Sequence, residues 1–385
     1  MDIEKVRSRF IKHFDGSTGT IYASPGRINL IGEHTDYNNG FVFPGAVEQG
    51  IVAEIKPNGT RNVRAYAIDL KDYVEFSLDD EQGPKATWSR FIYGVCREMM
   101  ALGVPVEGFN TAFYGDVPLG AGMSSSAALE SCYAFALNDL WGENKIEKYE
   151  LARVGQRTEH KYIGCNCGIM DQFASVFGKA GTLMRLDCRN GEYEYFPWHP
   201  DGYKLVLVNS CVKHELAGSP YNERRLQCEN VAAVIAKHHP EVETLRDATM
   251  EMLEEVKAEI TADEYKRARY VIGEVVRVLT VCDALKEGDY EKVGEMMYAT
   301  HEGLSKEYEV SCEELDFLND VAKECGVTGS RIMGGGFGGC TINLVSGEVY
   351  HKFCKTVVEK FAAKYGKEPK LIDVVIGDGS RRIDA

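Results

Sequence analysis

Glycines and serines between residues 118 and 130 form a group that could bind a phosphate. The segment reads PLGAGMSSSAALE, so Gly120 and Gly122 precede three serines that open a predicted helix. Glycine lets the backbone approach a phosphate without a Cβ in the way, and the free N–H groups of a helix N-terminus bind anions. The segment therefore predicts a phosphate site, with an ordinary serine-capped helix as the alternative. No G-x-x-x-x-G-K-[ST] occurs, which excludes a Walker-type loop.

Residues 24–40, SPGRINLIGEHTDYNNG, bring together the groups that could hold a neutral polyol. The polar side chains are Arg27, Glu33, His34, Asp36, Tyr37 and Asn38, and isoleucine and leucine interrupt them. We expect the apolar residues to anchor the segment in a core and the polar ones to face an enclosed cavity. Carboxylates, an imidazole and an amide can together donate to and accept from hydroxyl groups. The alternative is a charged turn with a solvated face.

Two acids lie close together in TEHKYIGCNCGIMDQF, residues 158–173. Glu159 falls near the end of a predicted helix, and Asp171 follows Gly168 in a glycine-rich connection. An acid held there could act as a base or bind a metal, although a helix cap is the commoner role. The nearby C-x-C lacks the second pair of ligands that a zinc site needs.

The segment SRIMGGGFGGCTINLV, residues 330–345, contains a G-x-G-x-x-G pattern. A dinucleotide site needs a helix after these glycines, whereas a strand is predicted here. The glycines instead predict a loop whose backbone passes very close to a ligand or another segment. Tight packing between domains is the alternative.

Length and composition limit the classes of function. The chain has 385 residues, enough for two domains. Its net charge of −15 argues against nucleic acid or an anionic membrane as the main partner. No stretch has the apolar length of a membrane span, and the start lacks the apolar region of a signal peptide. The 12 cysteines are scattered, so we predict reduced thiols in a cytoplasmic protein.

Hydrophobic periodicity predicts an α+β chain of two layered domains. In the first half, strand patterns alternate with helix patterns over 88–102, 125–141 and 147–163. Residues 189–204 contain glycine and proline with little periodicity, so we place a boundary there, giving domains 1–195 and 196–385. The second half has a strand pattern at 204–210, followed by helix patterns at 221–238, 243–258, 262–287 and 290–304. A strand pattern at 340–345, a helix pattern at 348–365 and a last strand pattern near 371–376 come after them.

These segments, in this order, resemble the galactokinases, which are members of the GHMP family of small-molecule kinases. SPGRINLIGEHTDYNNG is similar to the galactokinase signature, PLGAGMSSSAALE to the phosphate-binding motif of the wider family, and MGGGFGGC to its third motif. CGIMDQF and SPYNERRLQCENVA are similar to stretches that complete the sugar pocket. The likeness extends from about residue 20 to residue 345.

The resemblance implies a fold and an activity. The fold would be a ribosomal-protein-S5-like N-terminal domain and a ferredoxin-like C-terminal domain, with the active site between them and the last strand returning to the first domain. The activity would be ATP-dependent, Mg²⁺-assisted phosphorylation of the anomeric hydroxyl of α-D-galactose by a monomer. A kinase for N-acetylgalactosamine or arabinose, and a sensor that binds sugar and ATP without catalysis, are the alternatives.

The resemblance also implies roles for individual residues. Asp171 matches the catalytic aspartate and Arg27 its paired arginine. The sugar contacts would be Glu33, His34, Asp36, Gly168 and Tyr221. The ATP phosphates would lie against Gly120, Gly122, Ser124, Ser125 and Ser126, with Mg²⁺ on Ser126 and Glu159. Trp88 would help to line the adenine pocket. Two positions depart from the usual family pattern, since Met333 replaces a small hydroxyl residue and Ser24 replaces alanine.

Overall fold

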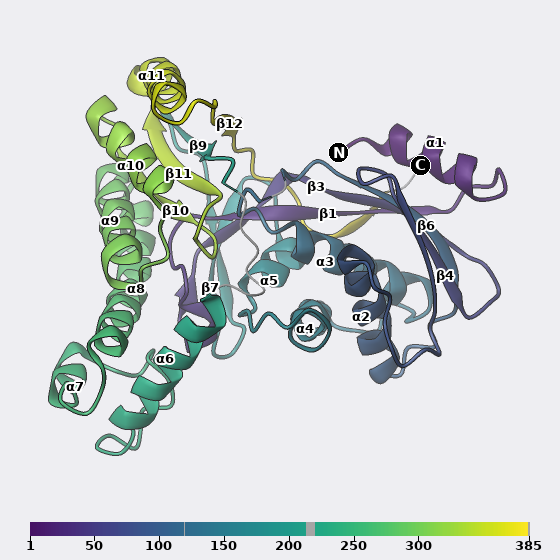
Figure 1. Ribbon diagram of the computed structural model, residues 1–385, viewed down its shortest axis with the longest axis horizontal. Helices are drawn as coiled ribbons and strands as arrows, with labels where there is room; N and C mark the ends of the chain where they lie inside the picture. The colour runs from purple at the N-terminus through teal and green to yellow at the C-terminus, as the bar shows by residue number, and fades with distance from the viewer. Residues whose placement is uncertain (119, 213–219, 384–385) are drawn as a thin grey trace.

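The computed structural model describes residues 1–118, 120–212 and 220–383. Three β-sheets, of six, four and three strands, are present within these residues. Helices cover the six-stranded and the four-stranded sheets (Figure 1). The α+β class predicted from the sequence is confirmed. No helix of the described part is long and apolar enough to cross a bilayer.

The largest sheet has six strands in the order β13-β1-β3-β6-β4-β5. Their bounds are Arg381–Ile383, Thr20–Asn29, Pro44–Pro57, Phe109–Gly115, Asn62–Ala67 and Asp72–Ser77. All neighbours are antiparallel except β4 and β6. Helices α2 (Thr87–Ala101) and α3 (Ser125–Leu140) pack on one face, and α1 (Ile3–His13) packs on the other (Figure 1).

Strand β1 contains residues 24–29, the first part of the segment that was predicted to bind a polyol. Periodicity did not mark it as a strand, because nine of its ten residues are buried and no polar alternation results. After β1 the chain turns through Gly32, whose φ of +94° favours glycine. A short 3-10 turn, Asp36–Asn38, follows before β2 (Phe41–Val42). Asp36 of this turn lines the cavity described below.

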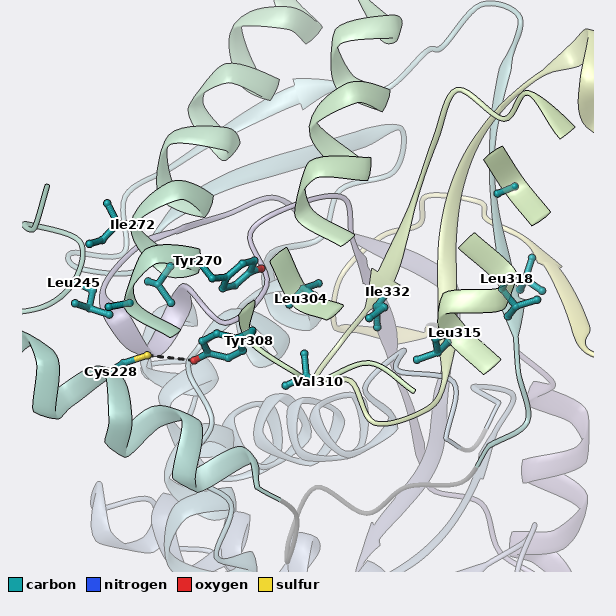
Figure 2. Packing of buried hydrophobic residues seen from close by; sticks show 14 of the residues in the cluster. Cys228, Leu245, Tyr270, Ile272, Leu304, Tyr308, Val310, Leu315, Leu318 and Ile332 are labelled. Carbon is teal, nitrogen blue, oxygen red and sulfur yellow. Dashed lines mark hydrogen bonds between the residues drawn. The ribbon is translucent and has the colours of Figure 1, made fainter. Parts of the chain in front are cut away.

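The second sheet has four antiparallel strands in the order β10-β11-β9-β12. They cover Gly329–Met333, Cys340–Ser346, Tyr203–Asn209 and Lys370–Asp373. The helices around this sheet are α6 (Tyr221–Ile235), α7 (Met250–Glu255), α8 (Ala262–Glu287), α9 (Tyr290–Glu302), α10 (Glu313–Cys325) and α11 (Gly347–Tyr365). Their shared core includes Cys228, Tyr270 and Tyr308 (Figure 2).

The third sheet pairs β2 with β7 (Thr182–Asp187) and β7 with β8 (Tyr193–Pro197). Strand β8 lies inside 189–204, which the sequence suggested was an irregular connection. A five-residue strand is too short to give a clear period. The predicted boundary at residue 195 falls within β8, and the division into two domains stays a prediction.

Helix predictions in the second half hold for 262–287, which is α8, and fail in part for 243–258. Only Met250–Glu255 is helical there. The carboxylate of Asp247 accepts hydrogen bonds from the N–H groups of Glu243 and Thr244, which fixes a turn instead. Helices α5 (Met170–Phe177) and α10 were not predicted.

The end of the chain returns to the six-stranded sheet. After β12, Ile376 forms a bridge with Val47, and β13 then pairs with β1. Ser380 lies just before β13 and is buried. Its hydroxyl is 2.8 Å from that of Ser24 on β1, and it donates to the carbonyl of Ser175 on α5 at 3.0 Å. Ser380 thus links β1 to α5, the helix that carries Asp171.

Candidate active site

A cavity of about 1010 Å³ contains residues from all the motifs singled out in the sequence. Every predicted site residue except Gly168 lines it: Arg27, Glu33, His34, Asp36, Trp88, Gly120, Gly122, Ser124, Ser125, Ser126, Glu159, Asp171 and Tyr221. Gly168 lies directly behind this surface. A Cβ on Gly168 would be 2.1 Å from Cγ of Asp36, so only glycine fits there.

Arg27 and Asp171 form a two-pronged ion pair in the cavity. Nε and Nη2 of Arg27 donate to Oδ1 and Oδ2 of Asp171, each at 2.8 Å. Nη1 of Arg27 donates to the carbonyl of Gly122 in the glycine-rich loop before α3. Arg27 is buried, whereas the Asp171 side chain is 28% exposed and open to a ligand. This geometry fixes the carboxylate and leaves it reachable.

Asp36 is a buried carboxyl group at one end of the cavity. It accepts a hydrogen bond from the N–H of Tyr37 at 2.9 Å. Burial, together with the charges of Asp171 and Glu33, raises the pKa of Asp36 to about 7. Both the protonated and the ionised form of Asp36 are therefore accessible near neutral pH.

Glu33 is held by the third glycine-rich segment rather than by its own loop. Its Oε1 accepts from Nη1 of Arg331 at 3.1 Å and from the N–H of Gly334 at 2.8 Å. Arg331 is fully buried and also donates to the carbonyls of Leu30 and Asn29. The sequence analysis missed Arg331, because 298 residues separate it from Glu33 and only its place before the glycines could have suggested it.

His34 faces the same end of the cavity in an unusual backbone conformation, with a φ of +62°. Its Nδ1 is 2.6 Å from the hydroxyl oxygen of Tyr37. Burial lowers the pKa of His34 to about 3, so the imidazole is neutral. Among the described residues, no group forms a hydrogen bond to its buried Nε2. This nitrogen is available for a ligand.

Helix α3 starts at the cavity as the sequence predicted. Its N-cap, Ser124, has a φ of +55° and makes no side-chain capping bond. The serine-cap alternative therefore does not explain this residue. The Ser126 side chain lies close to Glu159, and burial raises the pKa of Glu159 to about 7. An N-terminus with free hydroxyls beside a carboxyl group suits a phosphate and its cation.

The two glycine-rich segments pack against each other, backbone to backbone. A Cβ on Gly122 would be 2.7 Å from the carbonyl of Met333, and one on Gly339 would be 3.2 Å from the carbonyl of Gly120. The loop after β10 therefore closes over the loop before α3. A strand on each side of the glycines, β10 and β11, excludes the dinucleotide interpretation of this motif.

The other end of the cavity is apolar. Trp88 on α2 lines it together with Phe91 and Leu70. The indole Nε1 of Trp88 donates to Asp72 at 2.8 Å, which fixes the ring plane. A planar aromatic ligand could lie there, with its charged groups toward α3.

A buried carboxyl group that the sequence analysis did not single out lies close to the Arg27–Asp171 pair. Glu130, fully buried on α3, accepts from Nε2 of Gln172 at 3.0 Å. Burial, with Glu159 and Asp171 nearby, raises its pKa well above the ordinary value. Glu130 follows Ser126 by one helical turn, which is the only sequence signal that could have found it.

Comparisons with known proteins agree with this geometry. The fold and the cavity define a small-molecule kinase: residues 90–179 match the family model "GHMP kinases N terminal domain", and residues 282–358 match "GHMP kinases C terminal". Residues 8–57 match the "Galactokinase galactose-binding signature". The Methanococcus jannaschii mevalonate kinase shares the fold, with a TM-score of 0.63 at 19% identity over 96% of this chain and 99% of that one.

Full-length relatives narrow the assignment within that class. The galactokinase of Clostridium beijerinckii is 40% identical, covering 99% of each chain. That of Thermotoga maritima is 38% identical over 94% of this chain and 99% of its own. The crystal structure of Lactococcus lactis galactokinase complexed with galactose has a TM-score of 0.93 at 33% identity, covering 98% of each chain. The chain belongs to the galactokinase family.

Proposed function

We propose that this protein transfers the γ-phosphoryl group of ATP to the anomeric hydroxyl of α-D-galactose, giving galactose 1-phosphate and ADP. The observation that carries the proposal is the fixed Arg27–Asp171 pair, facing a cavity that the start of helix α3 also lines. The galactose complex of the Lactococcus lactis relative supports the choice of sugar.

Asp171 would accept the proton of the anomeric hydroxyl as its oxygen attacks the γ-phosphorus. The bond between phosphorus and the bridging oxygen then breaks, and ADP leaves. Arg27 would hold the carboxylate in place and stabilise negative charge on the transferred group. Phosphoryl transfer depends mostly on positioning and on neutralising charge, which is what this pair supplies.

Glu33, His34, Asp36, Tyr221 and the backbone of Gly168 would bind the sugar hydroxyls. The set includes acceptors and donors, so it can satisfy a polyol from several sides. The buried Nε2 of His34 without a partner supports this role. Gly168 would contribute by its backbone, since a side chain there would displace Asp36.

Gly120, Gly122, Ser124 and Ser125 would hold the ATP phosphates at the start of α3, and Trp88 would line the adenine end. Ser126 and Glu159 would hold Mg²⁺. Their hydroxyl and carboxylate donors fit this ion, because Mg²⁺ commonly takes one or two protein ligands and fills the rest with phosphates and water. Bound there, Mg²⁺ would neutralise phosphate charge. Among the described residues, no cluster of three or more acids, histidines or cysteines suits a metal.

We further propose that the protein acts as a cytoplasmic monomer without nucleic-acid or membrane partners, built from domains 1–195 and 196–385. The net charge of −15 supports the absence of polyanionic partners.

The first test is ADP release with Mg-ATP across galactose, N-acetylgalactosamine, glucose, arabinose and mevalonate. We expect strong turnover with galactose and little with the others. Turnover with another sugar would support the assignment as a kinase but would mean that galactose is not its substrate. Binding of galactose and ATP without turnover would instead make the protein a sensor.

The second test is Asp171→Asn. This variant should bind galactose nearly as well as the wild type, because amide and carboxylate have the same shape. Its kcat should fall by about 10²- to 10⁴-fold, the usual effect of losing a general base. Wild-type turnover in this variant would remove Asp171 from the mechanism.

A further inference from the structure

A line of buried hydrogen-bonding groups leads from His34 away from the cavity. Nδ1 of His34 is 2.6 Å from the Tyr37 hydroxyl, which is 2.8 Å from the hydroxyl of Tyr308. The Tyr308 hydroxyl is 3.3 Å from Sγ of Cys228 on α6 (Figure 2). Tyr308 and Cys228 are fully buried in the core of the second half of the chain. The line therefore joins the sugar end of the cavity to that core.

The direction of these hydrogen bonds decides what His34 offers a ligand. A neutral imidazole has one donor nitrogen and one acceptor nitrogen, and the partner of Nδ1 selects which is which. If Tyr37 donates to Nδ1, the proton lies on Nε2, and His34 donates into the cavity. If Nδ1 donates to Tyr37, Nε2 is an acceptor instead.

Several features favour the first direction. Burial lowers the pKa of His34 to about 3, which keeps the ring neutral, and raises that of Cys228 to about 11, which keeps the thiol protonated. The thiol can thus donate to Tyr308, Tyr308 to Tyr37, and Tyr37 to Nδ1. Sulfur is only a weak acceptor, so the Tyr308 hydroxyl donates to the oxygen of Tyr37 at 2.8 Å rather than to the thiol at 3.3 Å. The Tyr37 hydroxyl is then left to donate to Nδ1 at 2.6 Å, which places the proton of His34 on Nε2.

The rings around His34 hold this arrangement in place. The centroid of the Tyr308 ring is 4.7 Å from that of His34, and the Tyr221 ring is 5.4 Å away. Nε of Arg224 donates to the backbone carbonyl of Tyr308 at 2.7 Å. The ring of Tyr270 lies 4.9 Å from that of Tyr308 (Figure 2). Tyr308 therefore cannot turn its hydroxyl away without disturbing packed neighbours.

We propose that Tyr37, Tyr308 and Cys228 are positioning residues that hold His34 as the neutral tautomer protonated at Nε2, so that it donates a hydrogen bond to a sugar oxygen. We call the three residues the tyrosine relay. The inference rests on the proposed function for the identity of the ligand. The tautomer itself is a property of the ligand-free protein.

The test uses Tyr37→Phe, Tyr308→Phe and Cys228→Ala in the full chain. Tyr133→Phe is the matched control, because Tyr133 is also fully buried and its hydroxyl is 2.8 Å from that of Thr111, outside the relay. Galactose KM should rise about three- to tenfold in Tyr37→Phe and in Tyr308→Phe, the effect of one hydrogen bond. It should rise less in Cys228→Ala, which is the far end of the line. ATP KM and the control should stay within about twofold of wild type.

Nitrogen NMR of ¹⁵N-histidine-labelled protein gives the readout that a merely structural role would not move. Comparison with a His34→Gln variant identifies the His34 signals. Wild type should show a protonated Nε2 and an unprotonated Nδ1, and Tyr37→Phe should show a mixture of tautomers.

A wild-type proton on Nδ1 would overturn the inference, and so would an unchanged tautomer and an unchanged galactose KM in both tyrosine variants. Equal losses for galactose and ATP with a lowered Tm would also overturn it, since they indicate general unfolding. If the wild-type protein fails to phosphorylate galactose, the proposed function is wrong. The NMR comparison would still show whether the tyrosine relay sets the tautomer of His34.

Discussion

At the scale of single residues, Asp36 shows a conflict between stability and ligand binding. Its pKa rises from 3.8 to about 7, mainly through burial. The folded state therefore binds this proton more tightly than the unfolded state. Stability contributed by the protonated form is present below about pH 4 and is lost as the pH rises toward 7. At higher pH the protein carries a buried anion that folding alone does not favour.

Asp36→Asn should remove this pH dependence. Above pH 7.5 the variant should be more stable than wild type by about 1–3 kcal/mol, because the amide needs no charge in a buried site. The gain should be smaller at pH 5, where Asp36 is protonated. Galactose KM should rise, since an acceptor is lost. Thermal unfolding from pH 5 to 8.5 measures the first effect, and equal Tm differences at both ends would contradict the assignment.

Substitution of Arg27 tests whether the site needs the planar guanidinium group or only a positive charge. Arg27→Lys keeps the charge but cannot make both bonds to Asp171 and the third to Gly122. We expect kcat to fall about 10²- to 10³-fold, with galactose binding changed far less. Arg246→Lys is the matched control, because Arg246 binds both oxygens of Asp187 at 3.3 and 3.1 Å outside the cavity. Similar kcat losses in both variants would show that the change is not specific to the site.

At the scale of elements, two glycines of one loop separate packing from ligand binding. Gly120 and Gly122 have nearly the same φ, +71° and +68°, so alanine strains the backbone similarly at each. Within the described part of the chain, no atom of a non-neighbouring residue lies within 4 Å of a Cβ placed on Gly120. A Cβ on Gly122 would be 2.7 Å from the carbonyl oxygen of Met333.

Gly122→Ala should therefore lose about 2–4 kcal/mol of stability, and Gly120→Ala about 1 kcal/mol. Gly120→Ala should instead raise ATP KM, because its open space faces the proposed phosphate site. Denaturant unfolding and ATP titration of the two variants provide the comparison. Equal stability losses would mean that the two glycine-rich loops can move apart freely.

The elements also show what sequence could predict. Helix α8 was predicted with its observed bounds, because a capping box starts it at Thr261 and Gly288 ends it in a left-handed conformation. Residues 24–40 and 118–130 contain nine of the 13 predicted site residues that line the cavity, since each segment keeps its chemistry within a short stretch. Arg331 and Tyr308 could not be found, because their partners Glu33 and Tyr37 lie 298 and 271 residues away in sequence. Such pairings exist only once the chain has folded.

At the scale of the whole molecule, the C-terminal segment binds to both β1 and α5, the helix that carries Asp171. The Ser24 hydroxyl can donate to that of Ser380, which in turn donates to the carbonyl of Ser175. The Ser175 hydroxyl donates to the carbonyl of Pro25 at 2.8 Å. Ser175 lies one helical turn after Asp171 on α5, so these bonds hold the helix that carries the proposed base. They also give the hydroxyl of Ser24, which departs from the usual alanine, a specific partner.

Ser380→Ala should consequently destabilise the protein more than Ser24→Ala. The first change leaves a buried hydroxyl on Ser24 and a carbonyl on Ser175 without their partners, at about 1–3 kcal/mol, whereas the second leaves the bond from Ser380 to Ser175 intact. The double variant should be no less stable than Ser380→Ala alone, because it removes the stranded Ser24 hydroxyl. Urea unfolding of the three variants measures these differences. Strictly additive losses would show that the two hydroxyls act independently, and that the return of the chain to β1 depends on backbone pairing alone.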